Sequence, residues 1–358
     1  MRLLIAGGGT GGHLYPGIAI ARALAARGSE NAALFVGTAR GLEKRLVPQA
    51  GFPLRLIRAG ALKGMGPWRA ASTLLGLPGA IVASSRILRE WRPDAVLGVG
   101  GYASGPVMVA AALLGAPRAV LEPNAIPGIT NRILGRIVRE IYVAWEETAA
   151  RFPVGKAIVT GNPVRDEVTA VPDPTADGPF SLLVFGGSQG ARRINETMMA
   201  ALDELGDEGR EWRFVHQTGP ADAEKVRAAY ATRGLRAETA AFYDDMPARY
   251  RNADLVLCRA GAATIAELCG AGRGAILVPY PFAADDHQTA NARLLERAGA
   301  ACVIPQEGLT PGALARTLRE LARPRDRARE MGRRARALAR PDAAVVILDR
   351  LERLAAAQ

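Results

Sequence analysis

Cysteine and aromatic residues are scarce in this sequence. Its 358 residues include three cysteines, Cys258, Cys269 and Cys302, and no C-x-x-C pair. This spacing argues against a disulfide framework or a zinc knuckle and favours a reducing compartment. Aromatic residues make up 5% of the chain, and no basic stretch is interleaved with the stacking side chains of single-strand binders. We therefore expect no nucleic-acid partner.

Lysine is scarce as well, although the chain is basic. The net charge of +11 comes from 46 basic residues, four of them lysines, against 35 acidic ones. A surface with this charge attracts polyanions or acidic lipid headgroups. Ten arginines lie between Arg316 and Arg340. Such a run is more typical of a solvated helix face than of a binding patch.

Long uninterrupted apolar runs are absent. Residues 95–117 carry no charge, but glycines and Pro106 interrupt them, so they predict a strand, a glycine loop and a short helix rather than a membrane span. Residues 68–91 predict a weakly amphipathic helix that either lies at a bilayer interface or packs on the core with a kink at Pro78. The start MRLLIAGGG leads into a strand without a signal peptide, so we expect a cytoplasmic protein.

A glycine-rich pattern opens each half of the chain. LLIAGGGTGG at 3–12 is matched by LLVFGGSQGA at 182–191. Each predicts a strand, a phosphate-binding turn and a helix, which together begin a doubly wound nucleotide fold. The chain is also longer than one hydrophobic core usually serves. We therefore predict an α/β protein of two Rossmann-like domains that face each other across a cleft.

Strands and helices are predicted to alternate along the whole chain, which indicates parallel sheets with ligands at the carboxyl ends of the strands. The expected strands are 3–6, 32–36, 54–57, 95–99, 118–121, 141–144, 157–159, 181–185, 212–216, 238–242, 254–257, 275–278 and 301–304. The predicted domains are 1–165 and 166–340, with a proline-rich linker at about 171–179. A closing helix within 341–358 is expected to pack back on the first domain.

The first glycine turn formally matches the dinucleotide fingerprint at Gly7, Gly9 and Gly12. That fingerprint expects an acid at the end of the second strand, to hold the ribose diol. Here the strand ends at Thr38, and the first acid beyond it is Glu43. A dinucleotide oxidoreductase is therefore disfavoured, and the turn is expected to bind another phosphate.

Three further segments are suited to binding anions: GVGGYASGP at 98–106, GGSQGAR at 186–192 and CRAGAATIAE at 258–267. The last predicts a strand that turns through Gly261 into a helix, whose first amides suit a diphosphate. Glu267 could accept hydrogen bonds from a ribose diol, or it could be an ordinary acid near a helix N-terminus.

Together these segments resemble the MurG family of peptidoglycan N-acetylglucosaminyltransferases. The resemblance is carried by GGGTGGH at 7–13, GGYASGP at 100–106, EPN at 122–124, GNPVR at 161–165, GGSQGAR at 186–192, CRAGAATIAE at 258–267 and DHQTANA at 286–292. It implies a GT-B fold with an N-terminal domain for the lipid-linked acceptor and a C-terminal domain for the UDP-sugar.

The implied reaction moves N-acetylglucosamine from UDP-GlcNAc to the 4-hydroxyl of the undecaprenyl-linked muramyl-pentapeptide, with inversion. The implied location is the cytoplasmic face of the inner membrane, in contact with anionic inner-leaflet lipids. A UDP-GlcNAc 2-epimerase on the same fold is the second hypothesis. A dinucleotide-dependent reductase or a non-catalytic lipid-binding protein are more distant alternatives.

The resemblance also implies roles for individual residues. At the donor it places Thr10, Gly11 and Gly12 (phosphates and sugar), Asn124 (transferred sugar), Arg165, Ser188 and Gln189 (diphosphate), Phe242 and Tyr243 (uracil), Gly261, Ala262, Ala263 and Thr264 (phosphates), Glu267 (ribose), and Gln288 and Asn291 (N-acetylglucosamine). At the acceptor it places Gly100, Gly101, Tyr102 and Ser104. This chain departs from the family pattern at Ala260, where serine is usual, and at Leu121 and Pro123, where polar residues are common.

The chemistry needs a base and a group that stabilises the departing diphosphate. No two aspartates stand two apart, so we predict neither a D-x-D metal site nor a cofactor. We favour His13 as the base, because the positive end of a helix disfavours imidazolium. Glu122 is the alternative if His13 only orders its loop.

Overall fold

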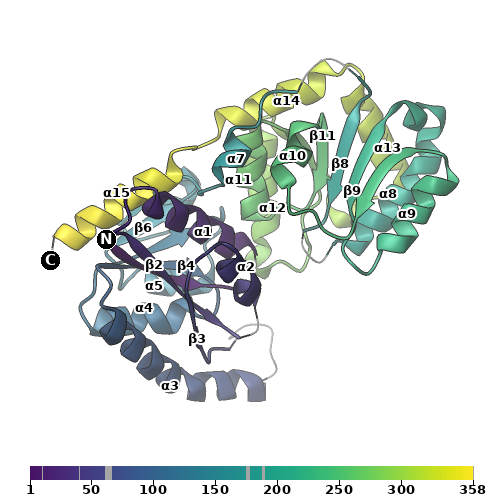
Figure 1. The fold of residues 1–358 in the computed structure, drawn as a ribbon. Coiled ribbons are helices and arrows are strands. Elements are labelled where there is room, and N and C mark those ends of the chain that lie inside the picture. Colours follow the sequence, from purple (N-terminus) through teal and green to yellow (C-terminus); the bar gives the residue numbers. More distant parts are fainter. Residues whose placement is uncertain (10, 40, 61–66, 175–177, 188–189, 358) are drawn as a thin grey trace. The chain divides into compact units, whose positions relative to one another are not determined.

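The chain forms two compact units, residues 1–165 with 340–358 and residues 166–339 (Figure 1). The structure is a computed structural model that describes residues 1–357 except 10, 40, 61–66, 175–177 and 188–189, and the side chains of 67–75 are likewise not described. The segment 171–179, predicted as a linker, lies on the second unit's side of this division.

The first unit contains a parallel sheet in the order β3-β2-β1-β4-β5-β6-β7. Its strands are β1 (Arg2–Gly7), β2 (Ala32–Thr38), β3 (Leu54–Ile57), β4 (Ala95–Gly100), β5 (Arg118–Glu122), β6 (Glu140–Val143) and β7 (Ala157–Val159). The central strand β4 is buried along its whole length, because helices cover both faces of the sheet.

The helices of the first unit divide between those two faces. They are α1 (Gly11–Ala25), α2 (Glu43–Gln49), α3 (Pro67–Trp91), α4 (Ser104–Leu113), α5 (Ile129–Leu134), α6 (Glu146–Ala149) and α15 (Ala343–Ala356). Leu3 and Ile5 of β1 pack with α1 and α15, whereas Leu4 and Ala6 pack with α3 and α4. This alternation follows from the two-residue period of a strand. The closing helix α15 therefore belongs to the core of the first unit.

Helix α3 covers the sheet with one face and turns the other outward. Ala80, Ser84 and Leu88 are buried, while the side chain of Val82 is 52% exposed. The described part of this helix thus has the core-packing contacts of a crossover helix together with an exposed apolar residue. No helix in the described part of the chain is both long enough and apolar enough to span a membrane.

The second unit repeats this architecture with a parallel sheet in the order β10-β9-β8-β11-β12-β13. Its strands are β8 (Ser181–Phe185), β9 (Arg213–Gln217), β10 (Arg236–Ala240), β11 (Leu255–Cys258), β12 (Gly274–Leu277) and β13 (Ala301–Val303). Its α-helices are α7 (Asp166–Thr169), α8 (Arg192–Leu205), α9 (Ala223–Thr232), α10 (Met246–Arg251), α11 (Ala262–Ala271), α12 (His287–Arg297), α13 (Pro311–Ala322) and α14 (Asp326–Ala337).

The predicted strands are confirmed. Each of the expected segments is a strand whose ends lie within two residues of the predicted ones. The agreement is close because short buried strands of a parallel sheet are continuous apolar runs bounded by glycine, proline or charged residues.

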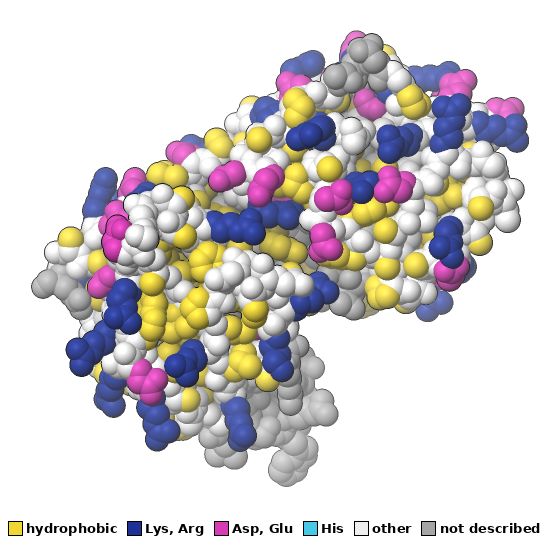
Figure 2. All heavy atoms as spheres, in the orientation of Figure 1, with side chains coloured by type: hydrophobic (Ala, Val, Ile, Leu, Met, Phe, Trp, Pro, Cys, Tyr) yellow, Lys and Arg dark blue, Asp and Glu magenta, His cyan; other side chains and the backbone are white. Residues whose placement is uncertain are grey.

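The arginine-rich stretch 316–340 is a solvated, ion-paired surface, as predicted. Its arginines pair with acids as follows: Arg319 and Arg323 with Glu208, Arg325 with Asp254, Arg333 and Arg334 with Glu330, and Arg336 with Asp173. Figure 2 shows basic and acidic side chains next to one another over the second unit. These pairings compensate part of the positive charge of the stretch.

A buried polar network lies inside the second unit, where His216 of β9 is fully buried. Its ring nitrogens lie 3.2 Å from Tyr230 Oη and 3.1 Å from Asn195 Oδ1. Burial lowers the pKa of His216 to about 3, because the low-dielectric interior disfavours imidazolium. The histidine therefore stays neutral in the folded protein at pH values where it is protonated in the unfolded chain.

We predict that His216 makes folding sensitive to mild acid. Its contribution to stability is complete above its unfolded pKa, near 6.5, and is lost as the pH falls toward 3. Between pH 7 and pH 5 the loss amounts to about 2 kcal/mol. Urea unfolding gives the free energy of unfolding at pH 7 and at pH 5. The difference between these two values should be smaller in His216→Gln than in wild type by the loss given above, whereas His287→Gln should keep the wild-type difference. An unchanged difference in His216→Gln would contradict the assignment.

Candidate functional site

In each unit, two glycine loops follow the pair of neighbouring strands at which the strand order reverses. These strands are β1 and β4 in the first unit and β8 and β11 in the second. In open parallel sheets, the carboxyl ends of such a pair form the usual ligand site, because the following helices diverge and their N-termini point to the same place. The loops that the sequence singled out, far apart in the chain, are thus brought together in pairs.

The two loops of the first unit interlock through their glycines. Gly8 N donates to Gly100 O at 3.3 Å. A Cβ on Gly101 would overlap Gly8 O, and one on Gly100 would lie 2.6 Å from Nδ1 of His13. Both residues also have positive φ, at 81° and 93°. Glycine is therefore required at 100 and 101 for His13 to lie against the β4 loop.

His13 is the third residue of α1, which opens with Gly11 and Gly12. Thr10, predicted to bind the donor phosphates, lies outside the described residues. The Arg165 guanidinium lies 5.3 Å from the ring centroid of Tyr15, also on α1. The candidate base and the candidate diphosphate ligand of the first unit are therefore both associated with the start of one helix.

A buried carboxylate that the sequence analysis did not assign to the site holds the first glycine loop. Glu43, the first residue of α2, is 0% exposed and accepts hydrogen bonds from Gly9 N at 2.9 Å, Thr38 N at 2.8 Å and Thr38 Oγ1 at 2.9 Å. Its carboxylate contacts Thr38 at the end of β2, near the position at which dinucleotide-binding folds carry their ribose-binding acid. Here, however, the carboxylate binds the protein's own loop.

The loop after β5 is organised by Glu122. This side chain is 2% exposed, and its oxygens accept four hydrogen bonds of 3.0 Å, from Asn124 N, Asn124 Nδ2, Gly128 N and Asn131 Nδ2. Burial raises the pKa of Glu122, and these four donors oppose the rise. Because its oxygens are already engaged, Glu122 is better suited to positioning Asn124 than to taking a proton from substrate.

The residues predicted to bind the acceptor differ in accessibility. Gly100 and Gly101 form the interlocked loop, and Tyr102 is 51% exposed. Ser104, at the start of α4, is fully buried, and a Cβ on Gly98 would lie 2.6 Å from its hydroxyl. Tyr102 is therefore the accessible side chain of this group.

In the second unit, Gln217 joins two loops that were predicted to bind the nucleotide. Its Nε2 donates to Gly187 O at 3.1 Å, and its Oε1 accepts from Tyr243 N at 2.9 Å. Gln217 is the last residue of β9 and is buried. The sequence analysis missed it, because a glutamine at a strand end carries no recognisable pattern. Ser188 and Gln189, in the loop after β8, lie outside the described residues.

The segment predicted to bind uracil follows β10. Phe242 is half-buried, whereas Tyr243 is 7% exposed and lies against Arg249, with the guanidinium 4.3 Å from the ring centroid. Burial is the main cause that raises the pKa of Tyr243 to about 12. Of the pair, Phe242 is thus the more accessible ring.

Helix α11 begins after β11 at the N-cap Gly261, and Ala262, Ala263 and Thr264 form its first turn. Glu267 is the sixth residue of the helix, so it lies beyond the turn in which an acid stabilises a helix N-terminus. Its Oε2 accepts a hydrogen bond of 3.0 Å from Tyr250 Oη. This contact engages one oxygen of the carboxylate.

The two residues of α12 that were predicted to bind the sugar contact the backbone of neighbouring loops. Asn291 is fully buried and donates to Ala260 O at 3.1 Å, and Gln288 Oε1 accepts from Tyr280 N at 3.0 Å. Asn291 thereby supports the entry to α11 through Ala260, the residue before the N-cap Gly261. Gln288 is half-buried and holds the loop after β12.

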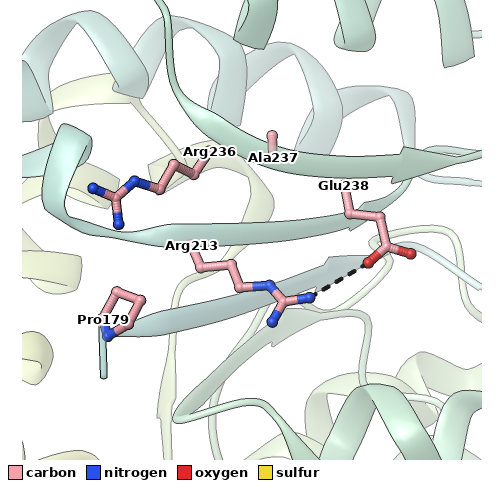
Figure 3. A pocket seen from close by; sticks show the side chains of 5 residues that line it. All are labelled: Pro179, Arg213, Arg236, Ala237 and Glu238. Atoms are coloured by element: carbon pink, nitrogen blue, oxygen red, sulfur yellow. Dashed lines mark ion pairs between the residues drawn. The ribbon is translucent and has the colours of Figure 1, made fainter. Parts of the chain in front are cut away.

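A separate pocket lies at the opposite end of the second sheet. It has a volume of ≈ 390 Å³ and is lined by Pro179, Arg213, Arg236, Ala237 and Glu238 (Figure 3). These residues belong to the amino ends of β9 and β10 and the chain before β8, so the pocket is remote from the glycine loops. In the described part of the chain, no group of three or more His, Cys, Asp or Glu side chains is arranged to hold a metal ion.

Comparison with known proteins assigns the chain to a family. Residues 3–143 match the glycosyltransferase family 28 N-terminal domain, and residues 181–347 match its C-terminal domain. The chain is 50% identical over 351 residues, 98% of its length and 92% of the relative's, to the UDP-N-acetylglucosamine--N-acetylmuramyl-(pentapeptide) pyrophosphoryl-undecaprenol N-acetylglucosamine transferase of Myxococcus xanthus. The chain belongs to the MurG family of glycosyltransferases.

Solved structures agree with this assignment. The chain is 32% identical to Acinetobacter baumannii MurG, with a TM-score of 0.81 over 98% of this chain and 99% of that one. The two parallel sheets are thus those of a GT-B glycosyltransferase, as predicted. A UDP-GlcNAc 2-epimerase from Neisseria meningitidis matches with a TM-score of 0.68 over 99% and 100% of the two chains, at 14% identity. That likeness shows a shared fold alone.

We predict that Glu43 stabilises the first unit through its loop contacts. Glu43→Gln places an amide NH2 among groups that donate hydrogen bonds, so it should lower the free energy of unfolding by about 1–3 kcal/mol. Urea denaturation measures the loss. Glu30→Gln, at an exposed position of the same unit, is the matched control. Equal stability of the two variants would rule out the stabilising role.

Proposed function

We propose that this protein transfers N-acetylglucosamine from UDP-GlcNAc to the 4-hydroxyl of undecaprenyl-pyrophosphoryl-MurNAc-pentapeptide, converting lipid I to lipid II in peptidoglycan synthesis. The observation that carries the proposal is the 50% identity, over nearly the full length, to a relative named for this transfer. The paired glycine loops at both strand-order reversals support it, because each can bind an anion through backbone amides.

The donor is proposed to bind to the second unit. The first amides of α11, at Gly261 to Thr264, would bind the diphosphate, and Glu267 would accept hydrogen bonds from the ribose hydroxyls. Phe242 and Tyr243 would contact the uracil ring. Gln288 is proposed to contact the sugar, and Asn291 to act mainly through its contact with Ala260.

The remaining donor contacts are proposed from the family resemblance. They involve Thr10, Gly11 and Gly12 for phosphates and sugar, Asn124 for the transferred sugar, and Arg165, Ser188 and Gln189 for the diphosphate. Arg165 suits this role because guanidinium binds phosphate oxygens in a bidentate manner. The Glu122 carboxylate accepts hydrogen bonds from the backbone N and the side-chain Nδ2 of Asn124, so it would fix the direction of the Asn124 side-chain amide.

The acceptor is proposed to bind to the first unit, at Gly100, Gly101 and Tyr102, with Ser104 supporting this loop from inside. His13 would remove the proton from the muramyl 4-hydroxyl as its oxygen attacks the anomeric carbon. The bond from that carbon to the UDP oxygen breaks, the configuration inverts, and UDP leaves with the electron pair. Helix amides and Arg165 would stabilise the charge that develops on the diphosphate.

One experiment separates this transfer from epimerisation. The protein is incubated with radiolabelled UDP-GlcNAc, with and without a polyprenyl-diphosphate muramyl-pentapeptide. A transferase forms labelled disaccharide-lipid and UDP only when the acceptor is present. A product formed from UDP-GlcNAc alone, with no labelled lipid, would instead identify an epimerase.

We predict that His13→Ala abolishes most turnover but not donor binding. Loss of a general base usually lowers the rate by about 10²- to 10⁴-fold. Steady-state transfer assays measure kcat. Calorimetry with UDP-GlcNAc should give an affinity within about threefold of wild type, since the donor contacts proposed on the second unit are unchanged. Turnover close to wild type would show that another group accepts the proton.

Membrane association is proposed to involve adjacent helices on one face of the first unit. Helix α3 packs on α4, and α4 packs on α5. These helices, with the residues that directly follow α4 and α5, expose the apolar side chains Val82, Leu113, Leu114, Ile129 and Ile133 and the basic side chains Arg86, Arg89, Arg132 and Arg136. Apolar residues flanked by arginine suit insertion among anionic headgroups. We propose a peripheral location at the cytoplasmic face of the inner membrane on this basis.

We predict that Leu113→Glu combined with Ile133→Glu weakens binding to vesicles of phosphatidylglycerol and phosphatidylethanolamine by at least about tenfold, because two apolar contacts are lost and two negative charges are added. Co-sedimentation measures the bound fraction. Val345→Glu, on α15 at the other face of the sheet, should bind like wild type. Equal binding of all variants would place the membrane contact elsewhere.

A further inference from the structure

A tyrosine hydroxyl that is not among the predicted substrate contacts points at Glu267. Tyr250 of α10 is 0% exposed, and its hydroxyl donates to Glu267 Oε2 at 3.0 Å. Glu267 itself is half-buried, on α11 after β11. The contact therefore links a core side chain to a carboxylate at the edge of the candidate donor site.

Two contacts besides the one to Glu267 hold Tyr250 in position. Its carbonyl oxygen accepts from Arg273 Nε at 2.7 Å, and Arg273 is itself fully buried. Its ring lies edge-on to Phe185, the last residue of β8, with 6.2 Å between the ring centroids. The tyrosine is thus anchored to the end of β8 through Phe185 and to Arg273, the residue that precedes β12.

A carboxylate on a helix surface rotates about its side-chain bonds unless a partner fixes it. A hydrogen bond from a rigid, buried hydroxyl selects one orientation of the carboxylate. Ligand binding then no longer has to order this side chain, so less conformational entropy is lost on binding. Burying a tyrosine hydroxyl is itself unfavourable without a partner. A phenylalanine would fill this part of the core without that need, whereas the tyrosine hydroxyl here donates to the Glu267 carboxylate.

We propose that Tyr250 is a positioning residue that orients Glu267 toward the ribose of a uridine nucleotide and thereby sets a preference for ribose over 2′-deoxyribose. The proposal rests on the ribose-binding role of Glu267 in the proposed function. A carboxylate can accept from two neighbouring hydroxyls only in a narrow range of orientations. Fixing its plane therefore favours a sugar that presents both hydroxyls.

The test compares UDP with 2′-deoxy-UDP by calorimetry on the full-length protein. Tyr250→Phe removes only the hydroxyl, and Tyr230→Phe is the matched control, because it deletes another buried hydroxyl of the same unit, bonded to His216. Glu267→Gln reports on the ribose contact directly. Thermal melts confirm that each variant is folded at the assay temperature.

We expect Tyr250→Phe to bind UDP about five- to tenfold more weakly, the equivalent of one ordinary hydrogen bond, and to bind 2′-deoxy-UDP nearly as wild type does. The ratio of the affinity for UDP to the affinity for 2′-deoxy-UDP should fall by the same factor. In transfer assays KM for UDP-GlcNAc should rise similarly while kcat stays within about twofold, since ground and transition states lose the same contact. Tyr230→Phe should keep the wild-type preference.

Three outcomes would overturn the proposal in distinguishable ways. If Tyr250→Phe keeps the wild-type preference while Glu267→Gln loses it, Glu267 binds ribose without help from Tyr250. If Glu267→Gln also keeps the preference, the ribose role of Glu267 is wrong, and the role of Tyr250 is wrong with it. If Tyr230→Phe narrows the preference as much as Tyr250→Phe, the effect is general loosening of the unit.

Discussion

The parallel connection of the strands is the constraint on which both candidate sites depend. Strands β1 and β4, and likewise β8 and β11, are neighbours that the chain joins only through long crossovers. The loops and helix N-termini that follow their carboxyl ends therefore lie close together. Backbone amides are crowded there, and few side chains can fit. The glycines follow from this crowding. At Gly100 and Gly101 any larger residue would collide with His13 or with the opposite loop.

Buried polar side chains, rather than apolar contacts, hold these loops in place. Glu43 and Glu122 accept backbone hydrogen bonds in the first unit, and Gln217 and Asn291 contact loop backbone in the second. Loops expose amide and carbonyl groups that the sheet does not satisfy, so a buried loop requires such partners. The result is a rigid base for the residues proposed to contact substrate, in keeping with catalysis that depends on preorganised donors.

The prediction from sequence succeeded for repeating elements and for glycine motifs, and it was weaker for the side chains behind them. Strands such as β8 are recognised because they are short and wholly apolar. Glu43 drew attention only as an acid too far from its strand, and Tyr250 and Gln217 drew none. Their roles come from partners that are 34, 17 and 30 residues away in the chain, and no local pattern encodes such contacts. The family resemblance implies that Ser104 and Asn291 contact substrate, and burial is what only the structure adds, since both side chains are fully buried.

Local sequence determined where strands, turns and helix starts occur, because hydrophobic period and glycine at tight turns are short-range properties. The sequence also indicated the family to which the chain belongs, through motifs spread along its length. Only the tertiary structure decided which loops are neighbours, which carboxylates accept hydrogen bonds from the protein's own amides, and which hydroxyl donates to Glu267. The physical reason is that hydrogen-bond partners are chosen by proximity in three dimensions, and that proximity arises from the order of strands in each sheet rather than from their order in the chain.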